Sequence, residues 1–248
     1  MAFLNMLVGV SGIMVVFLFG SVGEIITEKS GHLNLGTPGI MCIGATGALI
    51  GVKIFSAISG GAEAVFNGEG SPFLAIFLPL FFGLLLSGIA GLFYCFLVDS
   101  LQCNQNVTGL IITMFGAALY PFVGKIVCPD DTERLAFTHV GRTFFTHLFP
   151  DSVGKANVVT EIFLSHGFLW YIAIALAITA FFIIKKTRIG LSLRAVGENP
   201  GTSDASGVNV NAYKYIATTI GAAICGLGGV YYLLELNAGS ANSCPLGW

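Results

Sequence analysis

Long apolar stretches separated by short polar segments run through almost the whole chain. Asp, Glu, Lys and Arg are absent from six of them, which are residues 1–23, 30–52, 70–98, 100–124, 162–184 and 215–234. A helix needs roughly 20 apolar residues to cross the hydrocarbon core of a bilayer. The pattern therefore predicts six membrane-spanning helices, at about residues 3–23, 39–55, 73–98, 107–124, 162–184 and 213–234.

The composition agrees with a membrane protein rather than a soluble one. Charged residues make up 10% of the 248 residues and apolar types 55%, whereas about 25% of a soluble domain is charged. Too few charges are present to coat a water-facing surface. We therefore expect an all-α integral membrane fold, a polytopic helical bundle of about six transmembrane helices that forms a single domain over residues 1–248.

Other features narrow the choice further. Residues 1–23 lack a basic segment before the apolar run, so we interpret them as a retained span and not as a signal peptide. The net charge of −2 argues against nucleic acid as a partner. The spacing of Cys and His suggests no metal site, while a disulfide between Cys128 and Cys244 stays open.

The positions of basic residues predict the orientation. Lys185, Lys186 and Arg188 lie directly after the fifth span, so residues 185–214 should be cytoplasmic. Alternation then places residues 125–161 and the N-terminus outside. That assignment depends on residues 24–39, which are rich in Gly and contain Pro38, and which form either an ordinary loop or a break within the membrane.

A short helix is predicted inside this basic connection. Asn199 is a suitable N-cap, Pro200 suits the first helical position, and Gly207 suits a left-handed C-cap, which leaves room for about six residues. A helix of that length is stable only when it is docked against something. The alternative is a solvated loop. Asn209 or Asn211 can then cap the sixth span, and Asn106 the fourth.

Three segments carry a resemblance to a known family. They are RAVGENPGTSDASGVNVNAYKY (194–215), GEIITEKSGHLNLGTPGIMCIGA (23–45) and NQNVTGLIITM (104–114). Together they resemble ATP-binding-cassette (ABC) importer permeases of the branched-chain amino acid, ribose and nucleoside group, closest to the nucleoside or simple-sugar branch. The resemblance implies a plasma-membrane permease subunit that forms the path for a nucleoside or simple sugar.

The resemblance also implies partners. These are a second permease subunit, ATP-binding subunits and an extracytoplasmic solute-binding lipoprotein, all acting within membrane lipid. Because the chain has no GxxxxGK[ST] phosphate loop, ATP would be hydrolysed by the partner subunits and no cofactor would be bound here. The residues implied in ATPase coupling are Glu198, Asn199, Pro200, Asp204, Ala205 and Gly207. Family members usually continue for further spans, so the chain resembles a permease that lacks its last ones.

Candidate residues for the solute path are Glu24, Asn34 and Asn104. Each has a simpler interpretation, as an interfacial carboxylate, a turn-forming Asn and a polar turn residue. No enzymatic site is expected, because we find no nucleophile–base pair and no paired carboxylates. An ion-coupled secondary transporter usually needs carboxylates within its spans, and the predicted spans contain none. It remains the alternative, together with a truncated, non-functional membrane subunit.

Overall fold

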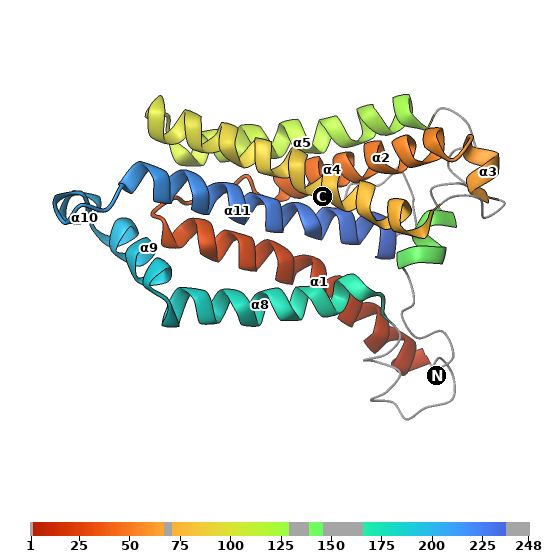
Figure 1. Ribbon diagram of the computed structural model, residues 1–248, viewed down its shortest axis with the longest axis horizontal. Helices are drawn as coiled ribbons and strands as arrows, with labels where there is room; N and C mark the ends of the chain where they lie inside the picture. The colour runs from red at the N-terminus through yellow and green to blue at the C-terminus, as the bar shows by residue number, and fades with distance from the viewer. Residues whose placement is uncertain (1, 67–70, 129–138, 146–165, 237–248) are drawn as a thin grey trace.

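The computed structural model describes residues 2–66, 71–128, 139–145 and 166–236, and all regular structure within these ranges is helical (Figure 1). The long helices are α1 (Ala2–Lys29), α2 (Thr37–Ile58), α4 (Pro72–Cys95), α5 (Gln105–Val127), α8 (Phe168–Lys186) and α11 (Val210–Tyr231). Helices α4 and α11 continue into π-helical turns, η1 (Phe96–Ser100) and η4 (Tyr232–Leu236). The short helices are α3 (Ala62–Phe66), η2 (Gly141–Phe145), α9 (Arg188–Glu198) and α10 (Pro200–Ala205).

Within the described residues, six helices are long and apolar enough to cross a membrane, which confirms the predicted all-α, multi-pass membrane fold. Their large exposed side chains are mostly aliphatic or aromatic. On α4, for example, Phe73, Phe77 and Phe81 are all exposed and stack in a row along the helix. A continuous apolar surface of this kind is suited to lipid tails and not to water.

The first span ends later than the apolar pattern predicts, at Lys29 instead of Gly23. Gly23 lies inside the helix because α11 comes so close there that a Cβ would collide with the Gly221 carbonyl oxygen. The glycine thus permits helix packing and does not end the helix. Residues 24–39 are accordingly neither a long loop nor a break in the membrane, but the last turns of α1, a tight turn and the start of α2.

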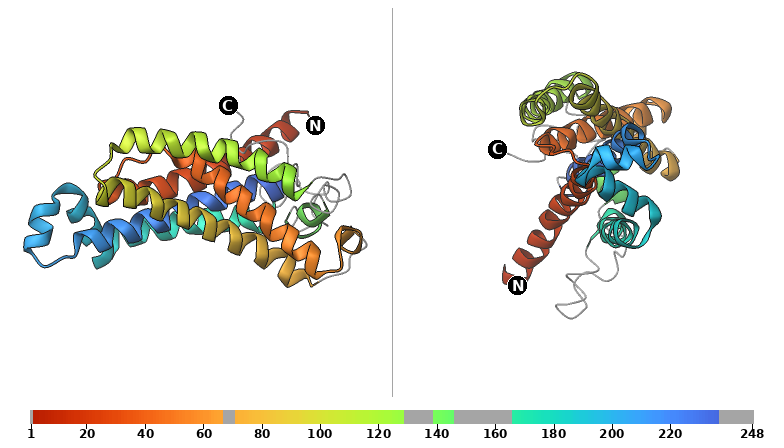
Figure 2. Two further views of the ribbon diagram at one scale, coloured as in Figure 1. Left: turned by 90° about the horizontal axis from the view of Figure 1, so that it is seen from above. Right: turned by 90° about the vertical axis from the view of Figure 1, so that its left-hand side faces the viewer.

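Successive long helices run in opposite directions (Figures 1 and 2). The turn of residues 30–36, the turn of residues 101–104 and helices α9 and α10 gather at one end, which we call the α10 end. The start of α1, α3 and η2 lie at the opposite end. This arrangement has the alternation that the sequence predicts for six crossings, with the start of α1 at the end of the bundle opposite α10, while the orientation in the membrane stays a prediction.

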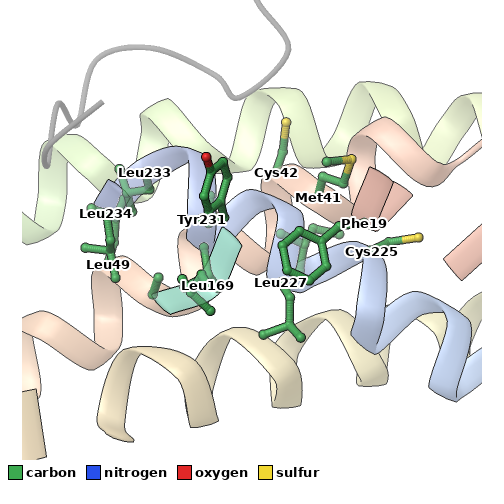
Figure 3. Packing of buried hydrophobic residues seen from close by; sticks show 14 of the residues in the cluster. Phe19, Met41, Cys42, Leu49, Leu169, Cys225, Leu227, Tyr231, Leu233 and Leu234 are labelled. Atoms are coloured by element: carbon green, nitrogen blue, oxygen red, sulfur yellow. The ribbon is translucent and has the colours of Figure 1, made fainter. Parts of the chain in front are cut away.

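Helix α2 forms the centre of the bundle. In the most apolar stretch of α2, 78% of the residues are buried, compared with 22% for α5 and 17% for α8. The reason is that α4, α5 and α11 all pack around α2. Figure 3 shows the core around α2 and α11, where Leu49 of α2 lies beside Leu234 of η4. Gly44 and Gly226 bring the two backbones together, since a Cβ on Gly44 would collide with the Gly226 carbonyl oxygen.

Some predictions fall outside the described residues. The expected start of the fifth span at residue 162 does so, as do most of residues 125–161 and Cys244, so the pairing of Cys128 with Cys244 stays a prediction. The described part of the fifth span, α8, reaches Lys186.

Candidate functional site

The short helix α10 stands at the tip of the α10 end, beyond the ends of the long helices (Figure 1). The Asn199 side chain accepts a hydrogen bond from the Thr202 amide at 3.2 Å, Pro200 is the first helical residue, and Gly207 has φ of +86°. These are the caps that the sequence predicts. Asn209 caps α11 by accepting from the Ala212 amide at 3.1 Å, which decides between the two asparagines proposed for that role.

All six residues implied in ATPase coupling are exposed, namely Glu198, Asn199, Pro200, Asp204, Ala205 and Gly207. Within α10 itself only Ser203 is buried. A hollow of about 630 Å³ separates α10 from the start of α11 and is lined in part by Pro200, Asp204 and Gly207. A capped helix that is this exposed offers its surface to another protein. The assignment of these residues to coupling stays a prediction.

Helix α9 was missed by sequence reasoning, which treated residues 188–198 as part of a connection. It buries Gly190, Leu193 and Val196, one residue per turn, and the two glycines of its sequence make it look like a loop. Those glycines permit contact instead. A Cβ at Gly190 would collide with the Ile183 carbonyl oxygen, and one at Gly197 with the Lys29 carbonyl oxygen. Helix α9 therefore connects α10 rigidly to α8 and to the end of α1.

The turn between α1 and α2 is held by side chains of two neighbouring helices, α4 and α5. The Tyr94 hydroxyl of α4 donates to the Leu33 carbonyl oxygen at 2.8 Å. The Leu33 amide donates to the Gln105 side chain at 3.0 Å, and the Thr113 hydroxyl of α5 donates to the Leu35 carbonyl oxygen at 2.9 Å. Since its backbone groups are satisfied by side chains of α4 and α5, this turn is a fixed part of the α10 end.

A charged cluster, formed by His32, Asp99 and Lys214, lies behind this turn. The Lys214 ammonium is 2.6 Å from the Asp99 carboxylate, and His32 Nε2 is 3.4 Å from the same oxygen. His32 Nδ1 is 3.2 Å from the Thr218 hydroxyl. Because a carboxylate only accepts, Nε2 carries the proton toward Asp99, and the Thr218 hydroxyl donates to Nδ1 of the neutral ring. The cluster links the first turn, the end of α4 and the start of α11.

The protonation state of His32 follows from its burial. Only 1% of its side chain is exposed, and burial lowers the pKa of the imidazole below its ordinary value. The Asp99 carboxylate acts in the opposite direction, while Lys214 again lowers the pKa. Burial is the largest of these effects, so His32 is neutral near pH 7.

His32, Cys95 and Asp99 place one potential metal ligand atom each within 4.8 Å of one another. The Lys214 ammonium already satisfies the Asp99 carboxylate at 2.6 Å, where a cation would have to bind. We interpret the cluster as an ion pair with a neutral histidine and not as a metal centre.

The three candidates for the solute path lie in different surroundings. Glu24 is half-buried on α1, and its carboxylate accepts from the Asn34 amide at 3.0 Å and from the Thr37 hydroxyl at 2.6 Å. Asn34 is buried, and its side-chain oxygen accepts from the Gly36 amide at 2.8 Å, as a turn-forming Asn does. Asn104 is exposed and caps α5 by accepting from the Asn106 and Val107 amides. Asn104 is thus the cap of α5. The sequence had suggested Asn106 for this role.

Glu24 also lines a hollow. This hollow of about 430 Å³ lies on the outer face of α1 and α2 and includes Ser21, Glu28 and Thr37. Several polar groups on a helix face within a membrane protein are costly next to lipid tails. That face is suited to an aqueous path or to a protein partner. The roles of Glu24, Asn34 and Asn104 in the path stay predictions.

A buried carboxylate in the sixth span was also missed. The apolar run ends at Leu234, but the helical segment continues through η4 and includes Glu235, whose exposure is only 8%. One carboxylate oxygen accepts from the Gly167 amide at 2.7 Å, and the other has no hydrogen-bond partner among the described residues. Glu24, Glu28 and Glu235 thus lie on spanning segments. All three lie toward the ends of these segments, so the expectation that no carboxylate lies at mid-membrane, which counts against ion-coupled transport, stays a prediction.

Comparison with known proteins gives a consistent result. Residues 6–248 match the family described as "Branched-chain amino acid transport system / permease component". The chain is 27% identical to the nucleoside ABC transporter permease protein NupC of Lactococcus lactis, over 93% of this chain and 67% of that protein. It is 31% identical to the guanosine ABC transporter permease protein NupQ of Bacillus subtilis, over 86% and 61%.

A third relative, a putative glucose ABC transporter permease protein of Haloferax volcanii, is 28% identical over 90% of this chain and 60% of its own length. The chain therefore spans 60% to 67% of the length of these relatives. No solved structure matches it.

Proposed function

This chain belongs to the family of branched-chain amino acid transport system permease components, and on that premise we propose that it is the membrane-spanning subunit of an ABC importer for nucleosides or simple sugars. The observation that carries the proposal is the capped, exposed helix α10 at the tip of a six-helix membrane bundle. Relatives named as nucleoside, guanosine and glucose permeases support the substrate class.

In this proposal an ATP-binding subunit docks on α10 and hydrolyses ATP. A binding surface there would include Pro200, Asp204 and Gly207, which line one hollow. Because α9 is wedged against α8 and the end of α1, a push on α10 reaches both helices. The same push reaches α11, whose Lys214 is paired with Asp99 at the end of α4. Movement of α10 would thereby tilt several spans together.

A solute-binding partner would deliver the solute at the opposite end of the bundle. Its form as a lipoprotein, and pairing of this chain with a second permease subunit, belong to the same proposal. The hollow beside Glu24, whose lining combines apolar residues with Ser21, Glu28 and Thr37, supports a path between two permease subunits, since it lies on the outer face of α1 and α2. In that position Glu24 and Ser21 would meet the solute.

The test is uptake of a labelled nucleoside or sugar by cells that carry this chain with its ATP-binding subunit. Single cysteines replacing Asp204 and Ala205 should cross-link to that subunit, whereas a cysteine replacing the exposed Met14 on α1 should not. Uptake should stop when the catalytic residues of the partner ATPase are removed. If the chain imports solute without an ATPase, the proposal is wrong.

The ion-coupled alternative keeps one observation in its favour, the buried Glu235 carboxylate with an unsatisfied oxygen. A proton-coupled carrier would lose uptake on collapse of the pH gradient while ATP remains present, and Glu235→Gln would abolish it. For an ABC permease, uptake follows ATP instead and survives a protonophore that leaves ATP intact.

A further inference from the structure

Helix α8 leaves the bundle as it approaches the α10 end. Its buried residues, Leu169, Trp170 and Ala173, all lie in its first two turns. Further along, α8 diverges from α1, which lies between α8 and α11 in Figure 1, and α9 contacts both α8 and α11 at the α10 end. The sequence is apolar over this whole length, so the divergence leaves an apolar surface on each helix.

The two surfaces enclose a groove of about 560 Å³, a volume typical of ligand pockets, which span about 300–1,000 Å³. Its lining is aliphatic apart from Thr179 and Tyr213, and includes Leu176, Ile183 and Ile184 of α8, Ile189 and Leu193 of α9, and Ile216 and Ile220 of α11. The Thr179 hydroxyl donates to the Ala175 carbonyl oxygen, so it offers little to a ligand. The groove is suited to a hydrocarbon chain.

Two cations lie next to groove-lining residues in the sequence, at the end of α8 and the start of α9. Lys186 follows the groove residues Thr179 and Ile183 by seven and three positions, so it shares their face of the helix. Arg188 directly precedes Ile189, which lines the groove from α9. Both side chains are exposed, and neither forms a salt bridge within the described residues. A fixed positive charge thus adjoins an apolar slot near one membrane surface.

We infer that this groove binds one acyl chain of an anionic phospholipid, whose headgroup phosphate contacts Lys186 and Arg188. The occupant is a lipid and not a further helix because the groove combines a nearly pure aliphatic lining with unpaired cations next to its lining residues. Basic residues at the cytoplasmic surface attract acidic lipids, and a phosphate satisfies both cations at once. A bound lipid would hold α8 at a set distance from α11, next to α9 and α10.

The purified chain in phosphatidylcholine vesicles provides the test. A trace of phosphatidylglycerol with a photoreactive diazirine midway along one acyl chain is added, and the matching phosphatidylcholine probe serves as comparison. After illumination, labelled peptides are mapped by mass spectrometry. We expect the anionic probe to label residues 176–184 and 212–224 several-fold more than the zwitterionic probe.

Three variants separate charge from shape. K186Q/R188Q should lower labelling by the anionic probe to the level of the zwitterionic one. K125Q removes an exposed charge from α5 at the opposite end of the bundle, away from the groove, and should leave labelling unchanged. Ala180→Phe fills the groove and should block labelling by both probes, with thermal unfolding as the check that it folds.

Equal labelling by the two probes would overturn the inference, as would labelling that K186Q/R188Q leaves intact. Absence of label from residues 176–184 and 212–224 would also overturn it, and would mean that protein covers the groove. None of these readouts involves transport, so the inference stands or falls separately from the proposed function.

Discussion

At the scale of single residues, the unusual feature is a buried histidine beside an ion pair, since His32 and Lys214 share one oxygen of Asp99. His32 contacts Asp99 and Thr218, and Tyr94 meets its ring edge-on at 6.4 Å between centroids. The groups that face it are Asp99 from η1, Cys95 and Tyr94 from α4, and Lys214 from α11. Its neutral form is the one that these contacts accommodate.

This burial predicts a loss of stability in acid. The folded pKa of His32 lies below the ordinary value of 6.5, so the unfolded chain binds a proton first as the pH falls through 6.5. Stability should therefore decline from about pH 6.5 down to the lower folded pKa and be unaffected by His32 above this window. The midpoint of thermal unfolding in detergent, compared at pH 7.5 and 5.5, measures this loss of stability. His32→Gln should reduce the difference between the two pH values, and an unchanged difference would contradict the prediction.

Glu24 predicts a stability effect that its neighbour Glu28 does not share. Glu24→Ala removes the acceptor of two hydrogen bonds, from the Asn34 amide and the Thr37 hydroxyl, and should cost about 1–3 kcal/mol in the free energy of unfolding. Glu28 is exposed, so Glu28→Ala should change it by less than about 0.5 kcal/mol. Chemical denaturation in detergent compares the two. Equal effects would mean that the Glu24 contacts contribute nothing.

At the scale of elements, α10 depends on its caps more than a long helix would, because its six residues make few hydrogen bonds of their own. Asn199→Ala should destabilise this helix by about 1 kcal/mol, and Gly207→Val strains a position at φ +86°. We expect both to weaken co-purification of the ATP-binding subunit.

The matched control for these α10 variants is Asn106→Ala, an exposed asparagine in the first turn of α5 that is not the cap of that helix and does not line the hollow beside α10. It should leave co-purification unchanged. Membrane insertion, followed by protease protection, should be normal for all three variants because the spans are untouched. If Asn199→Ala and Gly207→Val retain full association, α10 is not the docking helix.

At the scale of the whole molecule, the Asp99–Lys214 pair connects two spans that are 115 positions apart in the chain. Asp99→Asn and Lys214→Met should each destabilise the protein. Both side chains are largely buried, so either change leaves the remaining charge without its ion-pair partner. The double variant should lose less unfolding free energy than the two single variants together, by about 0.5–3 kcal/mol. Denaturation of the four proteins gives this coupling energy. A value near zero would show that the pair is incidental.

The same scale shows what the residue pattern could predict. Each charge-free run overlaps one of the six helices that are long enough to span, since lipid imposes a minimum helix length on any sequence. They fail at the ends. Helix α1 continues six residues past Gly23, and the sixth span takes in Glu235, because packing against α11 and a hydrogen bond from Gly167 stabilise residues that a hydropathy window rejects.

The sequence by itself determined that this protein lies in a membrane, that it has six spans, and that Asn199, Pro200 and Gly207 enclose a short helix. These features depend on composition and on neighbours a few positions away. Only the tertiary structure decided that His32 meets Thr218, 186 positions later, and that α8 diverges to leave a groove. Such contacts depend on how helices pack, and helix packing follows from the shapes of whole surfaces, which no local pattern specifies.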